Sequence, residues 1–258
     1  MSLLVVDGLS RSFGGVKAAQ GVSFTIAGGE LVALIGPNGA GKSTIFNMVG
    51  GQLKPDAGRI LLAGEDVTFL PPRARWRKGV GRTFQIAQTF VSMSVVENVQ
   101  MALLSRNGES RALGRPAARR YREAALELLR RTGMAAQADR PCSVLAYGDV
   151  KRLELALALA SEPKLLLMDE PTAGMSPKER GELMTLIAGV ARGRGIAILF
   201  TEHDMSAVFG HADRILVLVR GEIIAAGTPD QVHHDARVQE IYLGRSGARA
   251  ARLAGDAR

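Results

Sequence analysis

The sequence of 258 residues is 47% hydrophobic and 22% charged, with a formal net charge of +8 at pH 7 and a single cysteine, Cys142. This composition predicts a folded domain with a substantial core. It excludes an internal disulfide and a thiolate metal cluster, as is typical of a reducing compartment. The longest apolar run, residues 153–159, is broken by Glu154 and falls short of the roughly 20 residues that span a bilayer. Any role at a membrane is therefore expected to be peripheral.

The positive net charge leaves three kinds of partner open, namely nucleic acid, an anionic lipid surface and acidic ligands. Basic residues gather within residues 73–82, within residues 115–131 and in the tail after residue 244. We interpret these clusters as solvated faces or as a surface close to lipid, and we expect no nucleic-acid partner. Residues 245–258 are rich in alanine, glycine and arginine without periodicity, so we expect this tail to be disordered.

The first strands are predicted from short apolar segments bounded by glycine. Residues 3–6 and 22–26 have the patterns of antiparallel strands in a small sheet. Residues 31–35 form a continuous apolar run, which is typical of a strand buried on both faces. A glycine-rich loop and a predicted helix at residues 43–49 follow this run. The pattern thus changes from antiparallel strands to a strand–loop–helix unit.

Further apolar runs predict the rest of the central sheet. They occupy residues 165–168, 196–200 and 215–219, with helical stretches between the earlier runs. This alternation favours an α/β fold with a mostly parallel sheet, next to an N-terminal antiparallel β subdomain. Residues 97–132 are rich in alanine, leucine, arginine and glutamate. We therefore expect an α-helical subdomain, at roughly residues 86–160, inserted into the core.

The loop after the first buried strand carries a phosphate-binding pattern. It reads Gly36, Pro37, Asn38, Gly39, Ala40, Gly41, Lys42 and Ser43, which matches G-x-x-x-x-G-K-[ST] between a strand and a helix. The glycines let backbone amides converge on phosphate oxygens, Lys42 reaches the terminal phosphates, and Ser43, followed by Thr44, can hold Mg²⁺. The sequence therefore predicts a P-loop NTPase core that binds ATP and Mg²⁺.

Two further strand ends supply the other groups that a nucleotide hydrolase needs. Asp169 ends an apolar run, where a carboxylate can hold Mg²⁺. The adjacent Glu170 can orient and deprotonate the attacking water. His203 follows the next predicted strand and is expected at the same edge of the sheet, where an imidazole can hydrogen-bond the γ-phosphate. We therefore predict Glu170 and His203 as catalytic residues.

With a P-loop, a glutamine after a strand, a short signature, an Asp-Glu pair and a histidine in this order, the sequence resembles the ATP-binding subunits of ABC transporters. The resemblance reaches residue 244 and implies an ABC ATP-binding domain at residues 1–244. It implies that Phe13 stacks on adenine, with a core phenylalanine as the alternative. It also implies that Gln85 contacts Mg²⁺ and the attacking water and couples to the membrane subunit. Ala146 and Gly148 occupy the place of the family's LSGGQ signature.

A narrower resemblance rests on three segments, which are Gly-Arg-Thr-Phe-Gln at 81–85, Gly-Thr-Pro at 227–229 and Glu-Ile-Tyr-Leu-Gly at 240–244. These are similar to the LivG-type subunits of branched-chain amino acid importers. The resemblance implies two membrane permeases, a second homologous ATPase subunit in a heterodimer or homodimer, and a periplasmic solute-binding protein. It places the chain peripherally on the cytoplasmic face of the inner membrane. The solute stays open, because the other subunits select it.

The signature departs from the family pattern at Ala146. The family's serine has a hydroxyl that reaches the γ-phosphate bound on the opposing subunit. Its loss removes one charge-assisted hydrogen bond, worth on the order of 1.5–3 kcal/mol, whereas the backbone amides around Gly148 and the helix dipole remain. We expect the composite site formed with the partner subunit to be weakened.

Two other classes of function are open to the sequence. An ABC-type ATPase that acts on nucleic acid is the alternative favoured by the positive charge, but tandem cassettes, long coiled coils and zinc modules are not found in the sequence. A regulatory module that binds ATP without hydrolysis is opposed by Glu170 and His203. Turnover measured on the purified subunit, alone and with its partner, discriminates between these classes.

Overall fold

The computed structural model describes residues 2–83, 89–109 and 120–242. The N-terminal part forms a four-stranded antiparallel sheet, with β1 (Ser2–Phe13), β2 (Val16–Ala27), β4 (Ala57–Leu62) and β5 (Glu65–Asp66) in the spatial order β2-β1-β4-β5. The strands predicted at 3–6 and 22–26 are parts of two 12-residue strands that pair as a hairpin. The sequence analysis missed β4 and β5, which return to this sheet after the first helix.

A six-stranded sheet forms the centre of the molecule. It contains β3 (Leu31–Ile35), β6 (Val80–Arg82), β7 (Leu165–Asp169), β8 (Ala197–Thr201), β9 (Arg214–Val219) and β10 (Glu222–Gly227), in the spatial order β10-β9-β3-β8-β7-β6. The strands from β9 to β6 are parallel, and β10 is antiparallel to β9. The predicted mostly parallel sheet is confirmed, with the three-residue edge strand β6 and the antiparallel edge strand β10 added.

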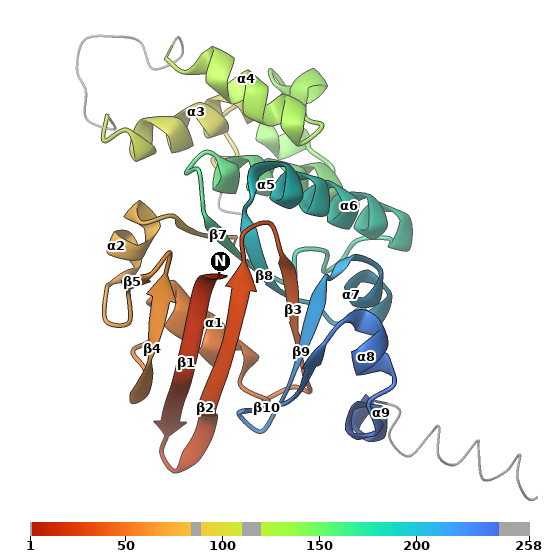
Figure 1. The fold of residues 1–258 in the computed structure, drawn as a ribbon. Coiled ribbons are helices and arrows are strands. Elements are labelled where there is room, and N and C mark those ends of the chain that lie inside the picture. The colour runs from red at the N-terminus through yellow and green to blue at the C-terminus, as the bar shows by residue number, and fades with distance from the viewer. Residues whose placement is uncertain (1, 84–88, 110–119, 243–258) are drawn as a thin grey trace, which may run out of the picture.

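The described helices are α1 (Lys42–Gly50), α2 (Pro72–Arg77), α3 (Val95–Arg106), α4 (Arg122–Arg131), α5 (Tyr147–Leu159), α6 (Pro177–Arg194), α7 (Met205–His211), α8 (Pro229–His233) and α9 (Ala236–Tyr242). Helices α3, α4 and α5 lie between β6 and β7 in the chain, and Figure 1 shows α3 and α4 together at the end of the molecule above α5. The inserted helical subdomain is confirmed, whereas its boundaries at 86–160 stay a prediction. None of the helices in the described ranges has the length and apolar character needed to cross a membrane.

Both faces of the central sheet are buried, as β3 illustrates. Its residues Leu31, Ala33 and Ile35 belong to a core cluster that includes α5 and α6, whereas Val32 and Leu34 belong to a second cluster that includes α1 and the antiparallel sheet. The side chains of this continuous apolar run therefore pack alternately into two cores, one on each face of the sheet. Because β3, β8 and β7 are parallel neighbours, the loops that follow them start at one edge of the sheet.

Candidate functional site

Two glycines fix the phosphate loop between β3 and α1. A Cβ atom at Gly36 would lie 2.1 Å from the carbonyl oxygen of Leu218 in β9, and one at Gly41 would lie 2.1 Å from the carbonyl oxygen of Ala18 in β2. Gly41 also has a φ of +108°, which strains any residue with a Cβ atom. Both positions therefore require glycine, and the loop packs against both sheets before α1 begins.

Lys42, the first residue of α1, folds back over this loop. Its Nζ donates to the carbonyl oxygens of Gly36, at 2.7 Å, and Pro37, at 3.1 Å. Burial lowers the pKa of Lys42, while the carboxylates of Glu170 and Asp169 act in the opposite direction. The ammonium group thus lies near two carboxylates and the loop carbonyls. A bound phosphate would give this partly desolvated cation a stronger partner.

Asp169 and Glu170 follow each other at the end of β7, and the end of β8 fixes both. Thr201 Oγ1 donates to Asp169 Oδ1 at 2.6 Å, and the Glu170 amide donates to the Thr201 carbonyl oxygen at 3.1 Å. Glu170 has a φ of +49°, a strained conformation of the kind that concentrates at functional sites. His203 Nε2 donates to Glu170 Oε1 at 2.8 Å. The structure therefore places Lys42, Asp169, Glu170 and His203 in one cluster.

A buried carboxylate beside this cluster was missed by the sequence analysis. Glu202 is only 5% exposed, and it accepts hydrogen bonds from the Thr172 amide at 2.8 Å and the Thr172 hydroxyl at 2.6 Å. This pair joins the segment after β7 to the segment after β8, which carry Glu170 and His203. The available signal was a charged residue two positions after the apolar run 196–200, where the chain is still expected to be buried.

The oxygen donors of the cluster fit a magnesium ion. Mg²⁺ prefers oxygen ligands and is usually held by one or two carboxylates together with substrate phosphates. Ser43 is exposed at the start of α1, with Thr44 half-buried after it, and Asp169 has one oxygen held by Thr201. Gln85, the other predicted magnesium ligand, lies outside the described residues. In the described segments, no group of three or more His, Cys, Asp or Glu residues is placed to hold a metal.

Phe13 lies at the end of β1 and is 46% exposed, so the alternative of a core phenylalanine is wrong. The guanidinium carbon of Arg11 lies 5.0 Å from the ring centroid, and Arg11 pairs with Asp56 at 2.5 Å. The cation holds the ring by a cation–π contact while much of the ring stays accessible. Stacking of adenine on Phe13 stays a prediction.

The signature residues lie exposed or half-buried at the start of α5. Ala146 is the exposed N-cap residue of this helix and gives it no side-chain hydrogen bond. A Cβ atom at Gly148 would lie 3.4 Å from Glu179 Oε1 and 3.6 Å from Met175 Cε. These contacts are with α6 and the segment before it, so the start of α5 packs on a different part of the chain from the Lys42 cluster.

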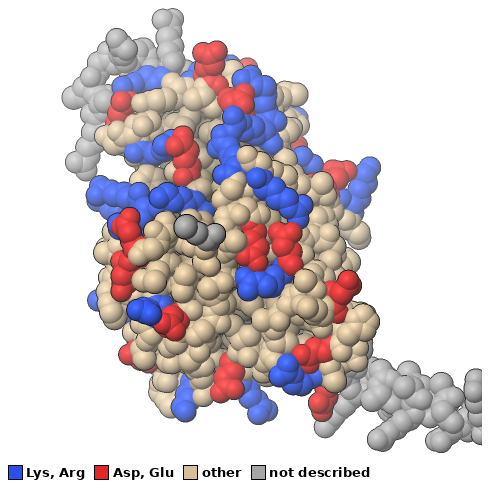
Figure 2. Space-filling model, in the orientation of Figure 1, with Lys and Arg blue, Asp and Glu red and all other residues tan. Residues whose placement is uncertain are grey.

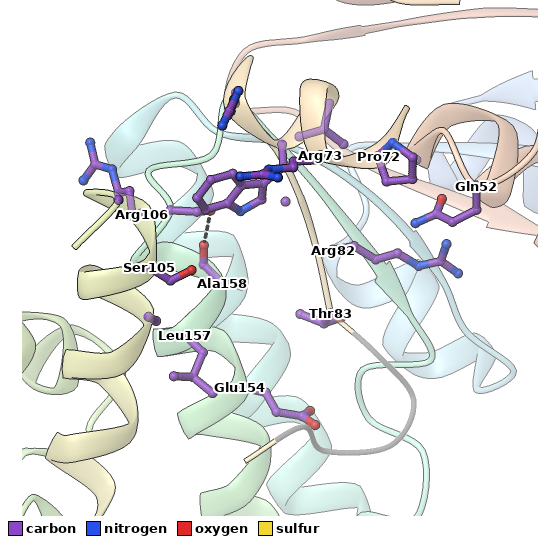
Figure 3. Close-up of a pocket in the computed structure, with 18 residues that line it drawn as sticks. Gln52, Pro72, Arg73, Arg82, Thr83, Ser105, Arg106, Glu154, Leu157 and Ala158 are labelled. Atoms are coloured by element: carbon purple, nitrogen blue, oxygen red, sulfur yellow. Dashed lines mark hydrogen bonds between the residues drawn. The ribbon is translucent and has the colours of Figure 1, made fainter. Parts of the chain in front are cut away.

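A groove of about 660 Å³ lies between α2, α3, α5 and the end of β6. In Figure 3 Arg73 comes from α2, Arg106 from α3 and Arg82 from the end of β6, and Glu154 lies on the α5 side. Arg77 also lines the groove, and Glu154 is the acidic residue among the described lining residues. Figure 2 shows basic side chains over the region of α2, between the helices above and the strands below.

A family model described as ABC transporter matches residues 19–173, and the chain belongs to this family. A second model, described as branched-chain amino acid ATP-binding cassette transporter, matches residues 222–248. Solved structures agree with this assignment. A nucleotide-free ATP-binding cassette from an ABC transporter has a TM-score of 0.82 and 31% identity, covering 95% of this chain and 100% of that one. An ADP-bound cassette has a TM-score of 0.84 with the same identity and coverage.

Among characterised relatives, the chain is similar to the high-affinity branched-chain amino acid transport ATP-binding protein LivG of Escherichia coli (strain K12). The identity is 42% over 251 residues, covering 95% of this chain and 98% of LivG. The corresponding protein BraF of Pseudomonas aeruginosa is 39% identical with the same coverage. The lipopolysaccharide export protein LptB of Haemophilus influenzae is 38% identical over 244 residues, again covering 95% and 98%. The resemblance to LivG-type subunits is thus confirmed.

Proposed function

We propose that the chain is the ATP-binding and ATP-hydrolysing subunit of an importer for branched-chain amino acids or a related small polar solute. The cluster of Lys42, Glu170 and His203 carries this proposal, in a chain 42% identical to LivG. A module that only binds ATP has no need of the Glu170–His203 pair. The names of LivG and BraF favour transport over the alternative, an ATPase that acts on nucleic acid.

Each residue of the cluster has one expected task. Lys42 and the loop amides bind the terminal phosphates of ATP. Ser43 and Asp169 hold Mg²⁺, which neutralises negative charge on the phosphates. Glu170 accepts a proton from the water that attacks the γ-phosphate, and His203, which donates to Glu170, keeps that carboxylate oriented. Phe13 and Gln85 retain the tasks that the family resemblance implies.

The start of α5 is expected to act on a second subunit. Ala146 is exposed and the first amides of α5 have no side-chain cap, which leaves them available for an anion. We infer that these amides bind the γ-phosphate held by a homologous ATPase subunit, in a heterodimer or homodimer. ATP then closes the pair and hydrolysis opens it. Because Ala146 has no hydroxyl, this composite site is expected to bind ATP less tightly.

The remaining partners lie at the membrane. We propose two permease subunits, contacted from the cytoplasmic face of the inner membrane, and a periplasmic protein that delivers the solute. The groove between α2, α3 and α5 supports this contact, because it combines apolar lining from Trp76 and Leu157 with basic residues, of which Arg73 and Arg77 are exposed.

Transport by the assembled complex in lipid vesicles tests the proposal. With ATP and Mg²⁺ on the side of this subunit, we expect uptake of labelled leucine, and we expect the loaded binding protein to stimulate ATP hydrolysis. The Lys42→Ala complex serves as the inactive control. Urea, offered in place of leucine, tests the solute class. Hydrolysis that does not respond to any solute or to the permeases would contradict a role in import.

A further inference from the structure

Arg82 lies where the central sheet meets the groove. It is the last residue of β6, which pairs in parallel with β7, so that Arg82 lies opposite Leu167. The side chain is 16% exposed and also lines the groove between α2, α3 and α5. Figure 3 shows Arg82 beside Thr83, extending away from Leu157 of α5. The side chain of Arg82 thus lines the groove and also lies close to Asp169 at the end of the neighbouring strand β7.

Two contacts connect Arg82 to the proposed magnesium site. Nη1 donates to Asn47 Oδ1 at 2.8 Å, and Nη2 lies 3.9 Å from Asp169 Oδ2. Asn47 belongs to α1 and lies one helical turn after Ser43, on the same side of the helix. Asp169 has its other oxygen, Oδ1, bonded to Thr201. Arg82 therefore bridges the helix that carries Ser43 and the carboxylate oxygen that Thr201 does not occupy.

The two contacts differ in strength. The bond to Asn47 has normal hydrogen-bond length, whereas 3.9 Å to Asp169 is the separation of an ion pair without a direct hydrogen bond. Burial lowers the pKa of Arg82, and Asp169 opposes that shift. An arginine stays charged at neutral pH under any such shift. A fixed positive charge therefore lies beside the carboxylate that we expect to hold a divalent cation.

We propose that Arg82 is a positioning residue that supplies the counter-charge of Asp169 before Mg²⁺ binds, and that Asn47 holds Arg82 back so that the metal can take its place. The inference rests on the proposed binding of Mg²⁺ and ATP. Two positive charges compete for one carboxylate, so Arg82 lowers metal affinity and Asn47 limits that effect. Because the same guanidinium lines the groove, a partner segment that engages it also alters the metal site.

Binding of Mn²⁺, as a paramagnetic substitute for Mg²⁺, measures this competition without any turnover. The full-length subunit is saturated with a non-hydrolysable ATP analogue, and free Mn²⁺ is followed by its electron paramagnetic resonance signal. Removing the charge in Arg82→Met should tighten Mn²⁺ binding by about three- to tenfold. Arg82→Lys keeps the charge but not the forked contacts of the guanidinium, so it should not tighten Mn²⁺ binding as Arg82→Met does. Arg73→Met, which removes an exposed arginine from the same groove, is the matched control.

A variant on the other side of the bridge has the opposite expected sign. Asn47→Leu keeps the shape of the side chain but removes the acceptor that Asn47 offers to Arg82, so that Arg82 is less restrained from approaching Asp169 and Mn²⁺ binding is expected to weaken. General damage to the fold would move both variants in the same direction, and thermal melting of each variant identifies such damage. Equal Mn²⁺ affinity in Arg82→Met and Arg73→Met, with normal binding of the ATP analogue, would overturn this inference about Arg82 and leave the proposed function standing. A wild-type chain that binds neither analogue nor Mn²⁺ would overturn the proposed function as well.

Discussion

Helices α1 and α5 both start without a side-chain cap, whereas α3 and α6 start with capping boxes formed by Ser94 with Glu97 and by Ser176 with Glu179. The first amides of α1 and α5 are therefore left for other partners, and we expect phosphate groups to be those partners. The loop before α1 is fixed by the close contacts of Gly36 and Gly41, while Ala146 before α5 is exposed. The starts of α1 and α5, which like those of α2 and α4 have no side-chain cap, thus differ in how firmly the chain itself holds them.

The same contrast continues inside the two helices. Arg75 is 1% exposed and donates to the carbonyl oxygens of Met48, at 2.5 Å, and Val49, at 2.7 Å, near the end of α1. Helix α5 buries the ion pair of Lys151 and Glu154 at 3.0 Å, but Glu154 Oε1 has no hydrogen-bond partner among the described residues. The end of α1 is therefore held by a buried arginine with satisfied hydrogen bonds. The body of α5 instead contains a buried carboxylate oxygen without a hydrogen-bond partner among the described residues.

The largest effect is expected for Glu170→Gln, which tests whether the cluster beside the phosphate loop and α1 contains the whole hydrolytic centre. Glu170→Gln keeps hydrogen bonding to water but cannot accept its proton, so we expect ATP hydrolysis by the assembled transporter to fall by about 10²- to 10⁴-fold. ATP binding should persist, and closed ATP-bound pairs should accumulate. Phosphate release measures the loss of hydrolysis, and size-exclusion chromatography measures the accumulation of closed pairs. Glu222→Gln, on the exposed part of β10, is the control, and hydrolysis near the wild-type rate in Glu170→Gln would place the base elsewhere.

Lys42→Ala tests the phosphate loop itself. The ammonium group lies between the loop carbonyls and two carboxylates, and no other cation replaces it toward a phosphate in the P-loop mechanism. Loss of its charge-assisted bonds should weaken ATP binding by about 100-fold or more, measured by titration calorimetry on the isolated subunit. Lys54→Ala removes an exposed lysine and should bind as wild type does. An unchanged ATP affinity in Lys42→Ala would contradict the assignment of residues 36–43 as a P-loop.

The cluster beside the phosphate loop and α1 could be predicted from the sequence because its chemistry lies in short local patterns. The glycine pattern at 36–43 is contiguous in the sequence. Asp169 ends β7, Glu170 follows it, and His203 lies shortly after β8, the parallel neighbour of β7. The fold class followed from the same alternation of strands and helices. Strands β4, β5 and β10 were not predicted, and the strand before Gln85 was given no bounds, because these strands gain their stability from pairing with distant partners rather than from local pattern.

The hydrogen bonds that hold the site residues in place could not be predicted from the sequence, for a related reason. Thr172 with Glu202, and Asn47 with Arg82, are pairs of residues 30 and 35 positions apart, so only the folded sheet brings them together. The motif at 81–85 included Arg82 as a feature of the family but did not indicate which residues Arg82 contacts or what it does. The contacts of Gln85 lie outside the described residues. Polar residues next to a motif thus become interpretable only when their tertiary partners are known.

Ala146→Ser sharpens the comparison between the two helix starts, because it adds both a cap and a hydroxyl to α5. In the isolated subunit a serine N-cap should accept from the amide of Asp149 and raise the free energy of unfolding by about 1 kcal/mol. In the assembled pair the hydroxyl should raise ATP affinity by about tenfold, with faster turnover if closure limits the cycle. ATP affinity of the isolated subunit should not change.

The two readouts of Ala146→Ser separate a local effect from a functional one. Chemical denaturation of the isolated subunit reports the cap, and ATP titration of the assembled pair reports the hydroxyl. A rise in stability without any change in the affinity or turnover of the pair would mean that residue 146 caps α5 but does not face the nucleotide of the partner. The assignment of Ala146 and Gly148 to the signature would then be wrong.

Glu154→Gln has the smallest expected effect and tests whether α5 is less satisfied than α1. Burial raises the pKa of Glu154 above the ordinary value of a glutamate, and Lys151 only partly offsets this rise. A carboxyl whose pKa is raised by folding contributes stability below its unfolded pKa and loses that contribution as the pH rises through the folded pKa. Glutamine does not ionise, and its oxygen can still accept from Lys151. The stability of Glu154→Gln relative to wild type should therefore increase as the pH rises from the ordinary range of a carboxyl group through the raised pKa of Glu154.

Urea denaturation at a series of pH values measures this trend directly. Glu162→Gln is the control, because Glu162 is exposed and pairs with Arg106 at the surface, where such pairs contribute little. A parallel pH dependence of wild type and Glu154→Gln would mean that the Lys151–Glu154 pair is as well satisfied as Arg75 beside the end of α1. The looser hold on α5 would then lie only at its exposed start, and a partner subunit would have to act through Ala146 and its neighbouring amides rather than through the body of the helix.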